Sequence, residues 1–591
     1  MKRALSLLAS AALMVSLAAS LTGCSTTSGL VAGSTVNLGE LGSSLSLNTD
    51  VASADASGTA VTELSSLTCA NFYSIDEKGE LSPNLSFGSV TVTKLNPFTV
   101  KYLLTDKAQW SDGEAISATD LLLSWAAATN FGGAKFGSAR FGGGLSQSSG
   151  VPKIGDKNQS LTIEFARPVA DYKTALSVAV AAHTLAKTAF PSEKLDSKAA
   201  SDRVLAAIQS ANPSDLKSLA KSYRLGFLIK SNFVFSKDLG VSSGAYEIVD
   251  ANSGAISLKA TQSNVTMPGA RAENIKMALY SSPLAMVADL KSGKLDLASV
   301  VPTETESNAD ITAALKGATA SGVSTSLVGT SSVEALIFNQ SAGSNFATTS
   351  YGAKDSAVAK AKALSIRLAF ENIVSIPKIQ VLIRAFEPIQ DAKSFVFTSD
   401  SSYYQSTIQD SGILAYQFAD GQKAYNAMHK LSRSVPVRVL FDSNNPRAQI
   451  EYSTLAEFAH DAGFGLSNVS SSDPAATLLS GQYDVYLSPM RVVGGVGLSL
   501  EKALAGLGSE NTPTEIKIGD YLSKIATSTD SVSRASWLKK IDGELVAEGF
   551  GLPMYQLPTI VASSNKFAKT PILVDGSSLT AGYATWNLTA K

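Results

Sequence analysis

The clearest alternation of apolar and polar positions in the chain lies at the start of the segment of residues 98–130. The segment opens with apolar residues at every second position, Phe98, Val100, Tyr102 and Leu104, a pattern that predicts a β-strand with one buried face. Ser111-Asp112-Gly113 then predicts a tight turn, because Asp and Ser bond to nearby backbone and Gly accepts a positive φ. Ser117 and Asp120 have the spacing of a capping box, which predicts that a helix begins there.

A helix–glycine–strand order occurs twice further along the chain. In the first case, residues 282–292 predict a helix that ends at Gly293, and strands are expected on both sides of it. In the second case, a helix over 475–480 is followed by Gly481 and a strand. A third helix is expected over 171–189. Strands that alternate with helices predict an α/β fold.

Several of these segments resemble the family 5 extracellular solute-binding proteins. The resemblance rests on Trp110-Ser111-Asp112-Gly113, then Ser117–Asp120, and then Ser124-Trp125. It extends intermittently from about residue 60 to residue 591. It implies a binding protein of an ABC importer, a class that takes peptides and, in some members, nickel or oligosaccharides. The signature residues themselves are expected to pack and turn without touching the ligand.

The resemblance also implies a fold and its domain boundaries. The implied fold is α/β, with two periplasmic-binding-protein-like lobes, an extra subdomain in lobe one and a central ligand cleft. The expected boundaries are lobe one at 35–332 with the subdomain at about 86–238, lobe two at 333–552, and a return to lobe one at 553–591. Ala335–Asn339 and Pro553–Gln556 are expected to form the hinge, because the ends of elements absorb the backbone changes of closure.

The N-terminus predicts export and lipid attachment. Lys2 and Arg3 precede an apolar run, and Leu21-Thr22-Gly23-Cys24 resembles a bacterial lipobox. Residues 1–23 are therefore expected to be a signal peptide and Cys24 the lipidated residue, with 24–60 a flexible tether that leads into a first strand. An uncleaved membrane-spanning anchor is the alternative. Either way, the expected location is the extracytoplasmic face of the cell membrane.

Composition narrows the possible partners and cofactors. The 49 basic and 50 acidic residues leave no excess of positive charge for a nucleic acid. If Cys24 is acylated, Cys69 has no disulfide partner and is expected to be a buried apolar residue. His183, His429 and His460 lie far apart and have no metal-binding motif around them, so neither a metal nor another cofactor is expected, and His183 is expected to be packed. A monomer is expected.

Departures from the family pattern bear on the ligand. Peptide binders of the family commonly hold the ligand's ammonium with an aspartate, but the corresponding place here falls at Val493, with no carboxylate nearby. Arg491 lies in the same segment and could bind an anion, or it could be a structural or solvated arginine. Asn71-Phe72-Tyr73 replaces the Gly-Leu pair that usually faces the ligand cleft in the family, and its bulkier side chains would either narrow the cleft or pack into the lobe. The residues expected to line the cleft are Tyr73, Asn339, Tyr486 and Arg491.

Three functions remain open at this stage. The first is a binding lipoprotein that delivers a peptide or peptide-like solute to ABC permease subunits. A receptor for oligosaccharides or another non-peptide solute is its variant, although four tryptophans offer few surfaces on which sugars stack. The second is an exported lipid-anchored hydrolase, which the absence of a GxSxG motif disfavours; the chain is expected not to be an enzyme. The third is a signalling or adhesion lipoprotein that has lost import.

Overall fold

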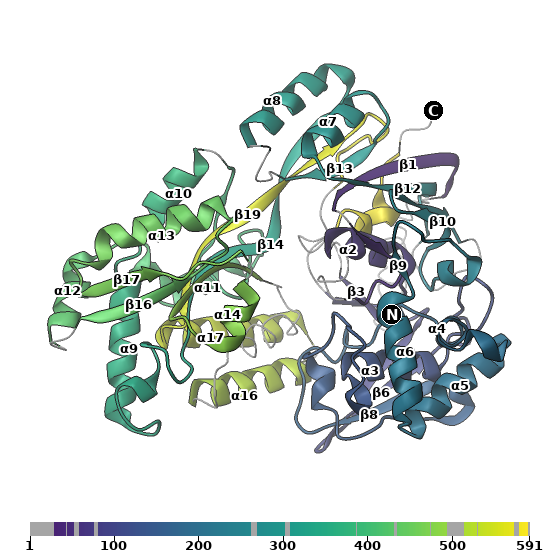
Figure 1. Cartoon of the computed structure of the whole chain (residues 1–591), viewed down its shortest axis with the longest axis horizontal. Helices are drawn as coiled ribbons and strands as arrows, with labels where there is room; N and C mark the ends of the chain where they lie inside the picture. The colour runs from purple at the N-terminus through teal and green to yellow at the C-terminus, as the bar shows by residue number, and fades with distance from the viewer. Residues whose placement is uncertain are drawn as a thin grey trace, which may run out of the picture.

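The computed structural model has two lobes (Figure 1), each built around a large hydrophobic core. Apart from Ala526, the core of lobe one takes its apolar side chains from Val36 to Leu297 and again from Val561 to Leu588. Apart from Ala170, the core of lobe two takes them from Val333 to Tyr555. The predicted two-lobe α/β fold is confirmed. The described residues are 29–42, 44–51, 58–75, 81–261, 269–301, 306, 308–385, 387–430, 434–472, 474–492, 513–528, 530–571 and 578–588.

One sheet of eleven strands runs through both lobes. Its order is β10-β11-β12-β1-β13-β19-β14-β18-β16-β17, and β15 pairs with β19 outside this path. The strands are β1 (Val31–Leu41), β10 (Tyr246–Asn252), β11 (Ala255–Ala260), β12 (Ala272–Tyr280), β13 (Leu297–Val300), β14 (Ser324–Phe338), β15 (Gln390–Asp391), β16 (Val435–Leu440), β17 (Phe464–Asn468), β18 (Val485–Arg491) and β19 (Gly551–Ser563).

The remaining described strands form three small sheets in lobe one. The first sheet has the order β5-β6-β8-β7, with β5 (Gly88–Leu95), β6 (Phe98–Leu104), β8 (Ser160–Phe165) and β7 (Lys153–Ile154). The other two are the pair β2 (Leu45–Ser46) with β9 (Leu228–Ile229) and the pair β3 (Tyr73–Ile75) with β4 (Leu81–Pro83).

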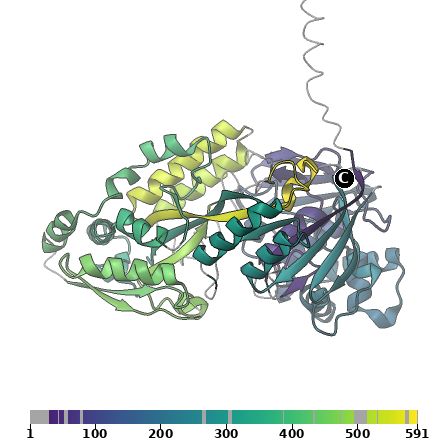
Figure 2. The same cartoon turned by 90° about the horizontal axis from the view of Figure 1, so that it is seen from above.

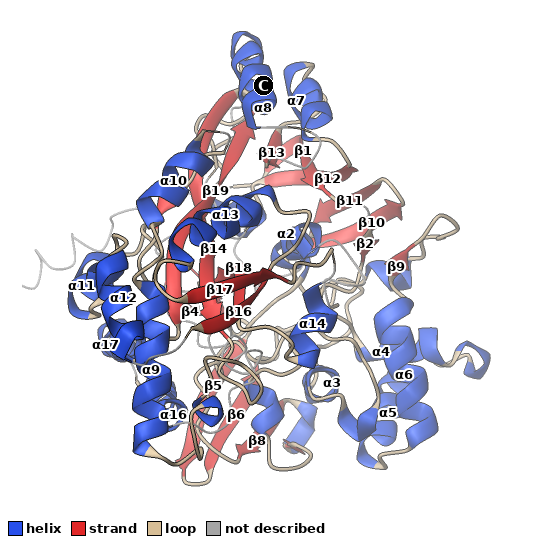
Figure 3. Cartoon of the chain, turned by 60° about the vertical axis from the view of Figure 1, so that its left-hand side comes forward, coloured by secondary structure: helices blue, strands red, loops and turns tan. Residues whose placement is uncertain are grey.

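Helices lie on both sides of the strands (Figure 3). Lobe one holds α2 (Gly58–Thr68), α3 (Ala118–Ala128), α4 (Ala182–Ala189), α5 (Ser197–Gln209), α6 (Pro213–Leu225), α7 (Pro283–Lys291) and α8 (Asn308–Ala318). Lobe two holds α9 (Ala357–Glu371), α10 (Ile376–Arg384), α11 (Tyr404–Asp410), α12 (Gly421–Lys430), α13 (Pro446–Ala459), α14 (Pro474–Ser480), α16 (Pro513–Thr527) and α17 (Ser531–Ala547). No helix in these ranges is long and apolar enough to cross a membrane.

The strand, turn and helix predicted for residues 98–130 are confirmed. The alternating segment is β6, and α3 begins at a capping box in which the backbone N–H of Ser117 donates to Asp120 Oδ2 at 2.8 Å. Ser111 in the turn exchanges hydrogen bonds with Ser242, its N–H donating to the carbonyl oxygen at 2.8 Å and its Oγ accepting at 3.1 Å. His183 is packed, as expected, with Nε2 2.9 Å from Asp112 Oδ2. The motif therefore joins segments of lobe one.

The helix predicted over 171–189 is wrong in its first half. Helix α4 begins only at Ala182, whose N–H donates to the buried Asp120 Oδ1 at 2.8 Å. This contact from α3 sets the start of the helix. Residues 171–175 form turns instead, and one of these turns carries Tyr172 and Lys173.

Strands β14 and β19 are the route by which the chain passes between lobes (Figure 2). They pair antiparallel along most of their length, with a register shift between Gly329 and Val333. Val328 still packs on the lobe-one core, whereas Val333 belongs to the lobe-two core. The crossing therefore falls at about 329–332 on β14 and 556–558 on β19, next to the two segments expected to form the hinge.

Candidate functional site

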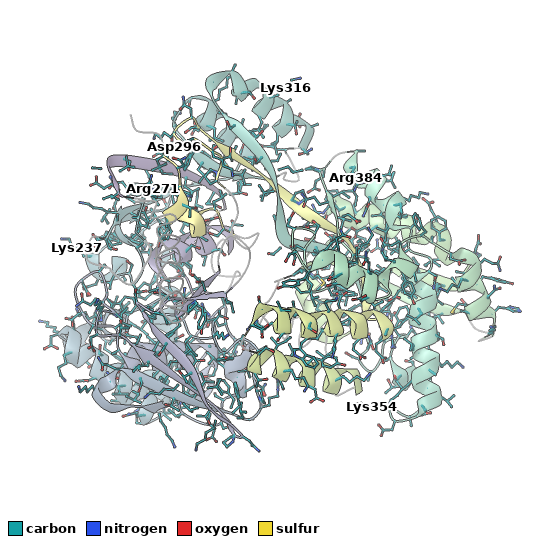
Figure 4. The ribbon with its side chains drawn as sticks, turned by 180° about the vertical axis from the view of Figure 1, so that it is seen from behind. Lys237, Arg271, Asp296, Lys316, Lys354 and Arg384 are labelled. Atoms are coloured by element: carbon teal, nitrogen blue, oxygen red, sulfur yellow. The ribbon has the colours of Figure 1, made fainter. Side chains whose placement is uncertain are left out.

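The lobes meet at a second place besides the crossing strands. Helices α16 and α17 extend from lobe two toward lobe one (Figures 1 and 4). Ala526 of α16 packs in the lobe-one core, and Ala170 of lobe one packs in the lobe-two core. Residues 170–173 and the α16–α17 pair therefore bring the two lobes into contact.

On the lobe-one side, two tyrosines surround a lysine. Lys173 Nζ lies 5.5 Å from the ring centroid of Tyr73 and 5.9 Å from that of Tyr172, distances at which an ammonium is attracted to an aromatic face. The carbonyl oxygen of Tyr172 accepts a hydrogen bond from Tyr102 Oη at 2.6 Å, and the Tyr172 ring packs edge-on against Phe98 at 5.7 Å. The alternating strand β6 thus supports this side of the site.

The segment Asn71-Phe72-Tyr73 divides between the two roles considered for it. Phe72 is buried and packs on Phe87, with ring centroids 5.0 Å apart. Tyr73, the next residue, is half-buried and faces Lys173. One bulky residue therefore fills the core of lobe one, while its neighbour lies at the contact with lobe two.

Arg534 supplies the lobe-two side of the site. It lies in the first turn of α17, a helix that Asp530 caps by accepting from Ser533 N–H at 2.8 Å. Its side chain is only 7% exposed. Burial raises the pKa of the Tyr73 and Tyr172 phenols, and the charge of Arg534 opposes that rise. The guanidinium is therefore within electrostatic range of both phenols.

Lys173 experiences the same charge. Burial lowers the pKa of its ammonium, and Arg534 lowers it further. No carboxylate in the described ranges offsets either effect on Lys173. Asp171, its near neighbour in sequence, is buried and accepts from Gly144 N–H at 3.1 Å instead. The contact between the lobes thus brings together two cations and two phenols.

The other residues expected in the cleft lie in lobe two. Asn339 is 1% exposed, and its Nδ2 donates to the carbonyl oxygens of Tyr483 at 2.8 Å and Gly481 at 3.2 Å. Tyr486, on β18, is half-buried, with its ring 6.3 Å from that of Tyr483. Arg491 ends β18, where it pairs with Ser332, and its side chain lies outside the described part of the chain.

Sequence reasoning missed Tyr172, Lys173 and Arg534. The first two fell within the helix predicted over 171–189, and no motif in the sequence marks Arg534. The only local signal was Pro168, which ends the preceding strand and so favours a loop after it.

A second group of charged residues is buried in lobe two beside the crossing. Glu334 and Glu451 are both 0% exposed. Arg447 Nε lies 3.5 Å from Glu334 Oε2, its Nη1 lies 2.9 Å from Glu387 Oε2, and Tyr555 Oη donates to Glu451 Oε1. Burial raises the pKa of Glu334 to about 7, with Arg447 opposing the rise. A carboxylate pair closed off in this way has no access to a substrate.

In the part of the chain that the structure describes, no group of three or more His, Cys, Asp or Glu residues is placed to hold a metal ion.

Comparison with solved structures identifies the fold. The periplasmic EDTA-binding protein EppA superposes with a TM-score of 0.65 at 15% identity, covering 95% of this chain and 97% of EppA. The chain has the fold of the solute-binding proteins. AppA from Bacillus subtilis, in complex with a nonapeptide, gives a TM-score of 0.59 at 11% identity, covering 94% and 99% of the two chains. AgaA from A. tumefaciens R10, in complex with agropinic acid, gives 0.59 at 16% identity, with the same coverage.

Comparison by sequence adds one curated relative. The uncharacterized lipoprotein Rv2585c of Mycobacterium tuberculosis is 24% identical over 543 residues, which cover 89% of this chain and 88% of that protein. No protein-family model matches the chain.

Proposed function

We propose that this chain is an extracytoplasmic solute-binding lipoprotein that delivers a peptide or peptide-like solute to the permease subunits of an ABC importer. The observation that carries the proposal is the meeting of polar side chains from both lobes, Tyr73 and Lys173 on one side and Arg534 on the other. Two lobes that are joined by a strand pair close around a ligand held between them. Tyr73 contacts the solute in this proposal.

The structural neighbours support a small solute in general. EppA is an EDTA-binding protein, and the structures of AppA and AgaA hold a nonapeptide and agropinic acid. Sugar-like solutes remain the alternative to a peptide. The name of the curated relative supports attachment through Cys24, with the mature chain monomeric and held on the outer face of the cell membrane.

Native mass spectrometry of the full chain, purified from its host in detergent, tests the proposal. We expect a protomer that carries a small solute, which fragmentation then identifies. Removing that solute should enlarge the radius of gyration in solution scattering, and returning it should reverse the change.

An unchanged scattering profile on return of the bound solute would contradict closure as the mechanism. Hydrolysis of peptides or glycosides by the purified chain would favour the lipid-anchored hydrolase instead.

A further inference from the structure

We propose that the solute carries an anionic group, a carboxylate or a phosphate, which Lys173 of lobe one and Arg534 of lobe two bind together. This inference rests on the proposed solute-binding function and adds the chemical class of the solute. It assigns the anion to these two residues rather than to Arg491.

The first step is the turn that carries Lys173, which positions its side chain. Tyr102 Oη donates to the backbone of this turn, and the Lys173 ammonium lies near the rings of both Tyr73 and Tyr172. The aromatic faces attract the cation but leave its N–H donors unused. A half-buried lysine held in this way, with no carboxylate partner in the described ranges, is oriented to receive an anion.

The second step is the position of Arg534 across the boundary between the lobes. Its residue is 93% buried in the first turn of α17, on the helix pair that meets residues 170–173. Backbone N–H groups at a helix start add to the positive potential there. A guanidinium presents a planar set of donors that matches a carboxylate or phosphate.

The third step is the attraction of both cations for one anion. An anion placed between Lys173 and Arg534 would be attracted by the ammonium of the first and by the guanidinium of the second. The Tyr73 and Tyr172 hydroxyls supply neutral donors beside it. The anion would therefore favour the closed form over the open form. A peptide's ammonium does not suit this site, whereas its terminal carboxylate does.

Isothermal titration calorimetry of the full chain in detergent tests the inference at constant ionic strength. The probes are trialanine, trialanine amide, citrate and inorganic phosphate. We expect binding of at least one of the three probes that carry a carboxylate or phosphate group, namely trialanine, citrate and phosphate. Trialanine binding without binding of its amide indicates a peptide carboxylate, and binding by phosphate alone indicates a phosphate-bearing solute.

Charge variants then locate the binding site. Lys173→Met and Arg534→Met should each weaken the bound anion at least tenfold, while Lys173→Arg should stay within about threefold of the original chain. Lys101→Met and Lys540→Met, at exposed positions on β6 and α17, remove the same charge and should change nothing. Far-ultraviolet circular dichroism checks the fold, and Lys173→Gln or Arg534→Gln replaces the methionine variant at the same position if that variant fails this check.

Three results overturn the inference. They are no binding by any of the three anions, binding that survives in both Lys173→Met and Arg534→Met, and loss of binding only in Arg491→Ala. If a co-purified solute is uncharged and binds Lys173→Met as well as the original chain, the inference fails while the proposed function stands. If no solute co-purifies and none changes the scattering profile, the proposed function fails as well.

Discussion

Gln556 Nε2 donates a hydrogen bond to the carbonyl oxygen of Thr330 at 2.6 Å, at the point where β14 and β19 pass between the lobes. The Gln556 Oε1 accepts a second bond from Ser399 Oγ at 2.7 Å. The amide is fully buried. One side chain thus ties together three segments at the crossing.

Replacing that amide with an apolar side chain should destabilise the protein. Gln556→Leu leaves the Thr330 carbonyl and the Ser399 hydroxyl without their buried partner, which costs about 1–3 kcal/mol. Urea unfolding measures the change in the free energy of unfolding. Gln417→Leu, where the amide makes one 3.5 Å bond within lobe two, is the control and should cost less. An equal effect of the two substitutions would contradict the special role of the crossing.

A methyl group at Gly329 should disturb the same crossing. A Cβ there would lie 2.4 Å from Asp400 Oδ2 and 2.6 Å from Gln556 Nε2. Gly329→Ala should therefore lower the free energy of unfolding by about 1–3 kcal/mol through overpacking. Gly317→Ala, in α8 with nothing within 4 Å of its Cβ, should raise it by about 0.5–1 kcal/mol. Equal melting temperatures for the two variants would refute the prediction.

Glu334 should make stability depend on pH. Burial holds its pKa at about 7 in the folded chain, above the ordinary value of 4.5. The folded state therefore keeps a proton that the unfolded state has released, and stability falls as pH rises from about 4.5 through about 7. The loss from this group is on the order of 3 kcal/mol. Glu334→Gln should reduce the difference between urea unfolding at pH 5 and at pH 8.

The neighbouring Glu451 keeps titrating in that variant, because burial and then Glu334 raise its pKa as well. A slope of stability against pH that is the same in Glu334→Gln and in the original chain would show that Glu334 does not carry the effect. Glu164→Gln, on the exposed face of β8, is the control for removing one negative charge.

Asn339 offers a test between contact with solute and support of the fold. Its Nδ2 already donates to two backbone carbonyls, and its Oδ1 accepts from Ser341 N–H at 3.0 Å. Asn339→Ala should lower the free energy of unfolding by about 1–3 kcal/mol. If the substitution instead changes the affinity for the co-purified solute more than it changes the free energy of unfolding, Asn339 lines the ligand cleft. Calorimetric titration and thermal unfolding of one preparation give both values.

Lipid attachment at Cys24 gives a prediction that mass alone decides. The intact mass of the detergent-extracted chain should correspond to residues 24–591 plus acyl groups. Cys24→Ala should release the chain from the membrane or leave it with its signal sequence. A mature chain that retains residues 1–23 would contradict the lipobox assignment.

Local patterns explain why the fold was largely predictable. Alternation at Phe98–Leu104 and the Ser117–Asp120 spacing are properties of neighbouring residues, so strand β6 and the start of α3 could be read directly. The start of α4 could not be read, since it depends on Asp120, a residue of another helix.

The candidate site depends on residues that lie even farther apart in the sequence. Lys173 and Arg534 belong to different lobes and lie far apart in the sequence, so only the folded arrangement of the two lobes brings their charges within range of each other. Tyr73 could be proposed because the resemblance supplied its position, whereas no repeat or motif marks Arg534.

Both passages between the lobes use one antiparallel strand pair, in which Val333 lies opposite Gln556. Residues 333–556 therefore enter and leave lobe two at neighbouring positions and form a continuous insertion, whereas lobe one is assembled from two separate stretches. A gene fragment for that insertion would encode the described strands and helices around the lobe-two core, and a short loop in its place would reconnect lobe one. Recombination could thus exchange lobe two as a single piece, and the hybrid would keep Tyr73 and Lys173 while receiving a new residue at the place of Arg534.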